Sequence, residues 1–386
     1  MSVIEERLAG SRKVYERLAA KLDRLPNGFP PTPEGTELRI LAKIFSPEDA
    51  AFALRVRPIP QTVEQVAKRL DRPVEETRGI LDAMARRGQI AAMKMKGRTM
   101  YMSVPFVVGI YEFQLPHLDK ELADLFEAYL PVLAGGAGRT VPAIGRVVPV
   151  NATIAARPEV LQHEDVRSMI EGARSFRVME CICRKEQELQ GRPCSHTRET
   201  CLAFSTRENA YDETFSLGRT ISREEAVAVV EAAEREGLVH CTYNVKQESM
   251  FMCNCCSCCC GFLRMLRDFD APGALARSNY VSVIDPGACT DCGACGDGRC
   301  PMAAIVSEDG ATAVIADRCI GCGVCVTVCP ADAITLVQRP PAERTEPPRT
   351  VVHWALERAD NRFGKAYGLG LRGWLAWQAA KGALQR

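Results

Sequence analysis

Apolar residues recur at helical spacing through the first quarter of the chain. Residues 2–25 place apolar side chains three or four positions apart, which predicts an amphipathic helix because such positions share one helix face. The stripe consists of Leu8, Val14, Tyr15, Leu18 and Leu22. Prolines and glycine in residues 26–33 end this helix. Three further helices are predicted, at residues 38–45, 62–70 and 75–87.

Two short strands are predicted after these helices. Residues 90–94 and 99–104 are rich in apolar side chains and flank the turn Lys96–Gly97, a pattern typical of a hairpin. Helix, turn, helix and a two-stranded wing resemble the winged helix-turn-helix fold. We therefore expect residues 1–115 to form a winged-helix-like domain.

The resemblance to a winged helix raises the question of DNA binding. The basic side chains available for phosphate contacts are Arg78, Arg86, Arg87, Lys94, Lys96 and Arg98. A DNA-binding face needs such a footprint. The helix predicted at residues 75–87 also carries Glu75, Glu76 and Asp82, whose carboxylates repel phosphate. A protein-docking or structural role is therefore favoured over DNA, which stays open as an alternative partner.

The nineteen cysteines change this picture more than composition or charge does. None precedes Cys181 and none follows Cys329. Net charge is +1, no run of 18 apolar residues exists, and the charged N-terminus lacks the apolar core of a signal peptide. These features predict a cytoplasmic protein without a transmembrane helix. Where thiols are kept reduced, clustered cysteines are typical of metal ligands.

Eight cysteines form an internal repeat. Cys289, Cys292, Cys295 and Cys300-Pro301 are followed, 30 residues on at the first three positions, by Cys319, Cys322, Cys325 and Cys329-Pro330. Residues 285–337 thus resemble the bacterial two-cluster ferredoxin, in which the fourth cysteine of each run ligates the other [4Fe–4S] cluster. The resemblance implies one cluster on Cys289, Cys292, Cys295 and Cys329. It implies a second on Cys319, Cys322, Cys325 and Cys300.

One feature departs from the ferredoxin pattern. Four residues, 296–299, separate Cys295 from Cys300, where the family commonly has three. The extra residue is expected to loosen the cover of one cluster and to alter its potential without abolishing ligation.

A second block of cysteines precedes the ferredoxin repeat. The candidate metal ligands here are Cys181, Cys183, Cys194, Cys201, Cys253, Cys255, Cys256, Cys258, Cys259 and Cys260. This density predicts at least one further iron–sulfur cluster, with zinc as the alternative. If residues 253–260 are extended, Cys253, Cys255 and Cys259 face one way and Cys256, Cys258 and Cys260 the other. Arg184 would stabilise thiolates beside it.

The whole arrangement resembles a loosely characterised group of anaerobe iron–sulfur proteins. In these, a winged helix, a Cys-x-Cys-Arg segment, a cysteine block and a two-cluster ferredoxin share one chain, and the resemblance spans residues 60–340. It implies no particular substrate.

The end of the chain carries all three tryptophans. Residues 339–350 are rich in proline and charge and predict a linker, and residues 351–385 predict a helix bearing Trp354, Trp374 and Trp377. A basic helix with tryptophans can lie on a membrane surface or dock a partner. The alternative, slightly favoured, is that it packs back on its own domain.

These predictions combine into an α+β multidomain protein. We expect a winged helix at 1–115, a connector and cysteine-rich metal-binding region at 116–280, a two-cluster ferredoxin domain at 281–338, and a linker with an amphipathic helical tail at 339–386. The favoured function is single-electron transfer between redox partner proteins, as a carrier or an oxidoreductase component. The alternatives are a redox-sensing transcription regulator, or an oxidoreductase with a catalytic cluster in residues 181–260.

Overall fold

Helices dominate the N-terminal third of the protein. The computed structural model describes residues 2–95, 97–150, 165–211, 217–247, 250–296, 298–308 and 311–383. Helix α1 (Val3–Asp23) begins at Ser2, whose side chain accepts a hydrogen bond from the Glu5 N–H. It packs against α2 (Thr36–Ile44) and against α3 (Pro47–Ala53), a short helix that the sequence analysis did not predict.

The second helical pair and its hairpin lie where the periodicity predicts them. Helix α4 (Val63–Leu70) starts with a capping box formed by Thr62 and Gln65, and α5 (Val74–Arg86) follows after a short turn. Strands β1 (Ala91–Met95) and β2 (Arg98–Met102) pair antiparallel, with Ala91 opposite Met102. Lys96, at the predicted turn, lies outside the described residues.

A seven-stranded sheet occupies the region predicted to be a connector. Its order is β6-β4-β5-β8-β7-β3-β9, antiparallel throughout except for the β3–β9 pair. The strands are β3 (Gly145–Val148), β4 (Ser175–Glu180), β5 (Glu199–Ser205), β6 (Arg219–Ile221), β7 (Val239–Tyr243), β8 (Phe251–Cys255) and β9 (Leu275–Ala276).

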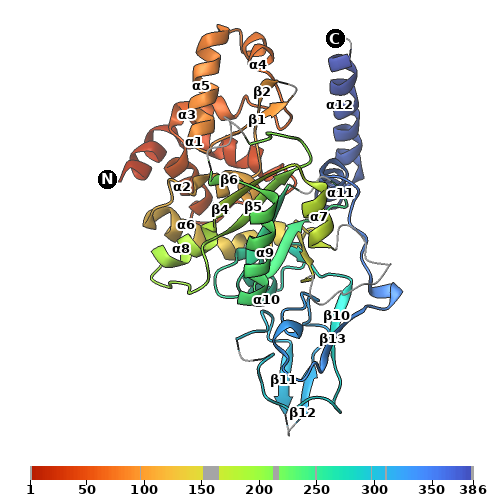
Figure 1. Cartoon of the computed structure of the whole chain (residues 1–386). Helices are drawn as coiled ribbons and strands as arrows, with labels where there is room; N and C mark the ends of the chain where they lie inside the picture. The colour runs from red at the N-terminus through yellow and green to blue at the C-terminus, as the bar shows by residue number, and fades with distance from the viewer. Residues whose placement is uncertain are drawn as a thin grey trace.

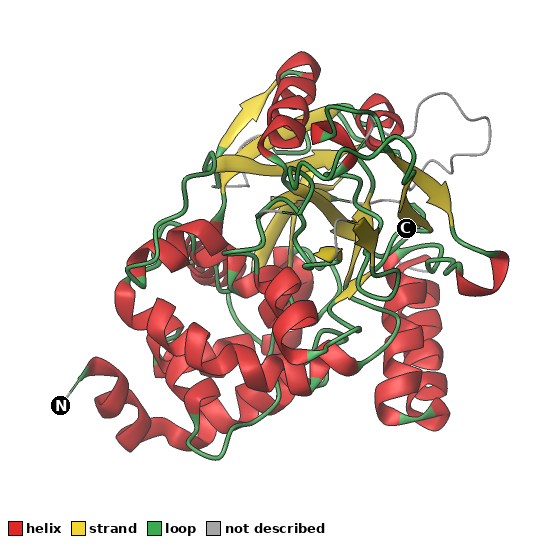
Figure 2. Ribbon diagram, turned by 90° about the horizontal axis from the view of Figure 1, so that it is seen from below, coloured by secondary structure: helices red, strands yellow, loops and turns green. Residues whose placement is uncertain are grey.

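Helices cover both faces of this sheet (Figures 1 and 2). Helices α7 (Val166–Gly172) and α9 (Arg223–Glu236) pack on one face through Ile170 and Val230. The other face joins the main core with α6 (Lys120–Gly135), α8 (Ile182–Leu189) and α10 (Gly261–Phe269). Cys241 of β7 and Cys255 of β8 belong to this second face, so the cysteine block is part of the hydrophobic core.

The ferredoxin-like module forms a separate lobe made of two hairpin-like pairs (Figure 1). Strand β10 (Tyr280–Ile284) pairs antiparallel with β13 (Ile334–Gln338), so the first and last strands of the module lie side by side. Strands β11 (Ile305–Glu308) and β12 (Ala311–Val314) form the second pair. The cysteines lie in the loops that connect these strands.

The C-terminal tail is two helices rather than the single one predicted. Helix α11 (Val351–Phe363) ends at Gly364, and α12 (Lys365–Ala383) projects from the molecule (Figure 1). Trp354 of α11 is buried and donates from Nε1 to the Ala143 carbonyl at 2.8 Å. The first half of the tail therefore packs back on its own chain. Within the described ranges, no helix combines the length and apolar character needed to cross a bilayer.

Candidate iron–sulfur and metal sites

The eight cysteines of the C-terminal module surround two separate cavities. One cavity is lined by Cys300, Cys319, Cys322 and Cys325; we call it the inner site. The other is lined by Cys289, Cys292, Cys295 and Cys329; we call it the outer site. Each cavity thus takes three cysteines from one run and the fourth from the other. Four thiols around one apolar cavity suit a [4Fe–4S] cluster.

Backbone and side-chain donors reach the sulfur atoms in a matching way at both sites. The Ala304 N–H donates to Cys300 Sγ and the Ala333 N–H to Cys329 Sγ, both at 3.2 Å. Ser282 Oγ lies 3.2 Å from Cys325 Sγ. Hydrogen bonds to cluster thiolates are one means of setting a reduction potential.

Gly321 allows the inner loop to approach the neighbouring strand. Its φ is +67°, and a Cβ atom there would lie 2.2 Å from both Ser278 Oγ and the Tyr280 carbonyl oxygen. Any side chain would push the loop away from β10. The glycine therefore allows the ligand loop to pack closely against β10.

The two sites differ in exposure. Cys292 of the outer site is exposed, whereas Cys319, Cys322 and Cys325 of the inner site are all buried. Burial raises the pKa of Cys322 well above its ordinary range and that of Cys325 to about 11. The outer site is thus the one that a partner protein can approach.

The inner site lies against the sheet-containing body. The Val150 N–H, just beyond β3, donates to the Cys322 carbonyl at 2.9 Å, and the Ser278 N–H donates to the Ile320 carbonyl at 3.1 Å. Cys319 and Cys322 share one hydrophobic core with the body. The module is therefore attached through its inner ligand loop.

The four-residue gap before Cys300 is a second attachment point. Arg299 donates to the Val324 carbonyl at 2.8 Å and to Thr327 Oγ1 at 2.7 Å within the module. It also donates to the Glu234 carbonyl at the end of α9, at 3.2 Å. Asp297 lies outside the described residues. Where it is described, this loop is held by hydrogen bonds rather than loosened.

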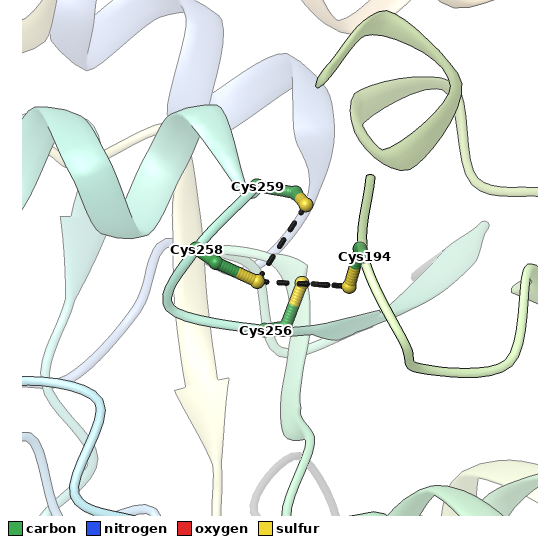
Figure 3. A group of neighbouring side chains, drawn as sticks. All are labelled: Cys194, Cys256, Cys258 and Cys259. Atoms are coloured by element: carbon green, nitrogen blue, oxygen red, sulfur yellow. Dashed lines mark hydrogen bonds between the residues drawn. The ribbon is translucent and has the colours of Figure 1, made fainter. Parts of the chain in front are cut away.

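Four cysteines of the middle block converge on one point. Cys194 Sγ lies 3.7 Å from Cys256 Sγ and 3.6 Å from Cys258 Sγ, and Cys258 Sγ lies 3.6 Å from Cys259 Sγ (Figure 3). All four sulfur atoms lie within 4.8 Å of one another. We call this group the compact site. Cys194 comes from the loop after α8, and the other three come from the turn between β8 and α10.

The predicted alternation of faces holds only as far as the strand does. Strand β8 ends at Cys255, and the chain then turns through residues 257–259. Cys253 and Cys255 lie together as predicted, but Cys259 joins the compact site and Cys260 joins Cys255. The extended conformation on which that prediction was conditional is therefore absent after Cys255.

The remaining six candidate cysteines form a closed ring of neighbouring thiols. The pKa of each is shifted by the thiols on either side of it, in the order Cys181, Cys183, Cys260, Cys255, Cys253, Cys201 and back to Cys181. We call this group the thiol ring. It draws on the start of α8, the start of α10, and strands β5 and β8.

The ring lies deep in the fold. Hydrogen bonds from neighbouring thiols hold the pKa of Cys181 and Cys260 well below the ordinary range. The same contacts raise the pKa of Cys183 and Cys255 well above it. Cys183, Cys201 and Cys253 keep some accessible surface although protein surrounds them.

Arg184 lies between the ring and the compact site. It is 1% exposed and donates to the Asn254 carbonyl at 2.9 Å and to Thr200 Oγ1 at 2.6 Å. The charges of Cys181 and Cys256 raise the pKa of its guanidinium against the opposing effect of burial. A buried cation here offsets the negative charge of thiolates.

Sequence reasoning missed Cys241 as a site residue. It lies opposite Cys253 in the β7–β8 pairing, and Cys255 lies close enough to affect its pKa. The alternation Val239, Cys241, Tyr243 on a strand antiparallel to Cys253 and Cys255 was the available signal, but it requires knowing that the two strands pair.

Acidic groups near the ring were missed as well. Glu186 accepts from the Tyr111 hydroxyl at 2.9 Å, and burial raises the pKa of Glu186 to about 8. Burial raises the pKa of Glu112 to about 7. No local pattern marks either residue, since their burial arises from long-range packing.

Comparison with known proteins bears on the C-terminal module. Residues 312–335 match the family model "4Fe-4S binding domain". The electron transport protein HydN of Escherichia coli K12 is 36% identical over 70 residues, which cover 17% of this chain and 40% of HydN. The HydN proteins of strains O6:H1 and O157:H7 match equally. The chain thus spans 40% of the length of these relatives. No solved structure matches it significantly.

The match and the cysteine geometry concern the same segment. Part of the repeat that carries eight of the nineteen cysteines falls within the family model. The protein therefore contains a 4Fe–4S ferredoxin domain near its C-terminus, which supports a role in iron–sulfur electron transfer.

Proposed function

We propose that the protein carries single electrons between a redox partner and its own cysteine-rich body. In this proposal the outer site holds one [4Fe–4S] cluster and the inner site another, with the ligand sets that line the two cavities. Such clusters, when bound, accept and release one electron at a time. The protein supplies the ligands, the hydrogen bonds to sulfur and the order of the sites.

The order of the two sites carries the proposal. Cys292 of the outer site is exposed to a partner, whereas the inner ligand loop is bonded to the body through the Cys322 carbonyl. The inner site packs against the part of the chain that holds the other eleven cysteines. A carrier that exchanged electrons only with other proteins would gain nothing from this contact. This arrangement favours conduction toward the body.

The thiol ring is the proposed destination inside the body. Six neighbouring thiols exceed the four ligands of one metal ion, which favours a polynuclear iron–sulfur centre there over zinc. Arg184 and the neighbouring acids Glu112 and Glu186 would set its charge environment. Whether this centre catalyses a reaction decides between a carrier and an oxidoreductase.

The N-terminal domain is proposed to dock protein rather than DNA. Its fold is proposed to be a winged helix formed by α4, α5, β1 and β2. Arg78 forms ion pairs with Glu64 and Glu75, and Arg87 pairs with Asp49 at 2.8 Å. Basic groups already paired with carboxylates make a weak phosphate-binding face. If the protein were a transcription regulator, these basic side chains would have to leave their carboxylate partners in order to bind DNA.

A reducing compartment fits the cysteine content. Nineteen unpaired thiols are expected to persist in a cytoplasm that keeps them reduced. The exposed Leu369 and Trp377 of α12 offer a surface for a partner or a membrane.

Anaerobic metal analysis with stepwise reduction tests the proposal. The intact chain should contain roughly eight irons and eight sulfides in the module, plus iron and sulfide in the body. Electron paramagnetic resonance should resolve two reducible [4Fe–4S] clusters that interact magnetically. Fewer than eight irons after full reconstitution, or a two-iron spectrum, would falsify the two-cluster assignment.

A further inference from the structure

We propose that the compact site, formed by Cys194, Cys256, Cys258 and Cys259, holds a single tetrahedral zinc ion and no iron–sulfur cluster. The inference concerns four cysteines that the electron path does not need. It therefore stands apart from the electron-transfer proposal.

The size of the site carries the inference. Zinc binds thiolate sulfur at about 2.3 Å, so the sulfur atoms of a tetrahedral site lie about 3.8 Å apart. Three sulfur–sulfur distances of the compact site are 3.6, 3.6 and 3.7 Å, and all four atoms lie within 4.8 Å of one another. Four thiols this close surround one ion.

The ferredoxin module supplies an internal comparison. A cubane holds its thiolates outside a cube of iron and sulfide, so their sulfur atoms must lie farther apart than around one ion. Within the described part of the chain, the cysteines of the outer and inner sites do not gather within 4.8 Å, and the compact site does. The two kinds of site therefore differ in the same structure.

The charge of the surroundings suits four thiolates with one divalent ion, a net charge of −2. Arg184 lies close enough to Cys256 for the charge of that thiolate to raise the pKa of the guanidinium. Its Nε is buried and has no hydrogen-bond partner among the described residues. Arg267 donates to the Ser257 carbonyl at 3.1 Å and lies close enough to Cys258 for their charges to interact. Arg184 thus places one buried positive charge beside the site, whereas the charge of Arg267 is shared with Asp268, with which it pairs at 2.6 Å.

Such an ion would act as a structural staple. Four thiolates complete its coordination and leave no open position, which is typical of structural zinc. It would tie the loop that carries Cys194 to the turn that leads into α10. Cys256 and Cys259 also pack against Ala233 and Leu238 at the end of α9. Arg299 of the ferredoxin module docks at this same end.

The test compares metals in the intact chain and in one variant, purified anaerobically. We expect about one zinc per chain, absent in Cys194→Ser, with iron and sulfide contents unchanged. The matched control Ser257→Ala lies in the same turn but offers no ligand, and it should keep its zinc. Loss of about four irons and four sulfides in Cys194→Ser would overturn the proposal, as would unchanged zinc. Loss of about one iron without sulfide in Cys194→Ser would show that the site holds a single iron ion, and it would overturn the assignment of zinc.

A second measurement covers the case in which Cys194→Ser does not fold. The wild-type chain is produced with Co²⁺ in place of Zn²⁺, and its absorption spectrum is compared with that of the zinc form. Charge-transfer and ligand-field bands of a tetrahedral tetrathiolate support the proposal, and their absence from chain that contains its full iron overturns it. Because the readouts are zinc and cobalt, failure of the electron-transfer proposal would show separately, in iron and sulfide.

Discussion

Each cysteine of the C-terminal module belongs to one of two proposed ligand sets, and substitution of single residues can tell the sets apart. Cys292→Ser and Cys329→Ser should both remove the outer cluster, since both side chains line the outer cavity. Cys322→Ser and Cys300→Ser should both remove the inner one. Each variant is expected to lose roughly four irons and one of the two reduced-cluster signals, measured by iron assay and electron paramagnetic resonance.

The pairing of variants makes the crossed assignment testable. Cys329 follows Cys325 in the chain, so a simple sequential assignment would group it with the inner set. If Cys329→Ser lost the same cluster signal as Cys322→Ser rather than the one lost in Cys292→Ser, the assignment of Cys329 to the outer site would be wrong. Thr290→Ala, between two ligands of the outer site, is the control that should keep both signals.

The buried carboxyl of Glu186 predicts a pH dependence of stability. Burial raises its pKa from 4.5 to about 8, so the folded state binds a proton that the unfolded state releases at lower pH. This group should therefore make stability fall as pH rises from about 5 to 8, by at most about 1.4 kcal/mol per pH unit, and Glu112, whose pKa burial raises to about 7, should add a slope of the same sign below about pH 7. Glu186→Gln should flatten this slope in anaerobic urea unfolding between pH 5 and 8. The neighbour Glu127, whose pKa Arg264 lowers to about 2, contributes no slope there. An unchanged slope in Glu186→Gln would contradict the assignment.

At the scale of elements, the sequence was informative where a pattern is local. Helical periodicity placed α1, α4 and α5 to within a few residues, because each helix satisfies most of its hydrogen bonds internally. The seven-stranded sheet went unrecognised. Strands such as β3 and β6, of four and three residues, carry too short a pattern, and their pairing joins distant segments.

The cysteine block shows the same limit. Its residue types indicated metal ligands. How these cysteines divide between the compact site and the thiol ring depends on the turn after Cys255 and on Cys194, which comes from another loop. By contrast, the grouping of the ferredoxin cysteines came from a family resemblance. Each cavity is lined by the four cysteines that this resemblance implies for one cluster, and their role as ligands stays a prediction.

The junction between α9 and the ferredoxin module predicts the role of Arg299. Its guanidinium bridges Val324 and Thr327 of the module to Glu234 of α9. Hydrogen bonds to charged groups contribute about 1.5–3 kcal/mol each, so Arg299→Ala should loosen the junction. We expect at least tenfold faster hydrogen exchange around residues 234–238, with iron content unchanged.

Two further variants sharpen this test. Gly237 has a φ of +79°, and a Cβ atom there would lie 2.1 Å from the Arg299 guanidinium. Gly237→Ala should therefore reproduce the effect of Arg299→Ala from the other side. Arg318→Ala removes a guanidinium that donates to the Ala303 carbonyl inside the module at 3.4 Å, and it should leave exchange at α9 unchanged. Equal exchange in all three variants would count against the junction.

At the scale of the whole molecule, the two ends of the chain and the sheet meet at α11. Arg358 is fully buried and donates to carbonyl oxygens of three separate regions. These are Pro26 after α1 at 2.9 Å, Ala137 after α6 at 2.9 Å, and Pro142 before β3 at 2.5 Å. One side chain thus joins the N-terminal helices, the sheet and the tail, although Pro26 and Arg358 lie 332 residues apart.

This junction predicts that Arg358→Ala affects the protein far from the substitution. It leaves several buried carbonyl groups without a donor, at a cost on the order of 3 kcal/mol or more. Burial lowers the pKa of Arg358 to about 10, so removing its charge recovers part of that cost but restores no donor. We expect faster proteolysis both in the tail and in residues 24–35, followed by mass spectrometry under anaerobic conditions. Arg372→Ala, which breaks only the more exposed pair with Asp360 in the tail, is the control that should leave residues 24–35 protected. Cleavage confined to the tail in Arg358→Ala would show that α11 is an appendage and that the N-terminal helices are held by their own core.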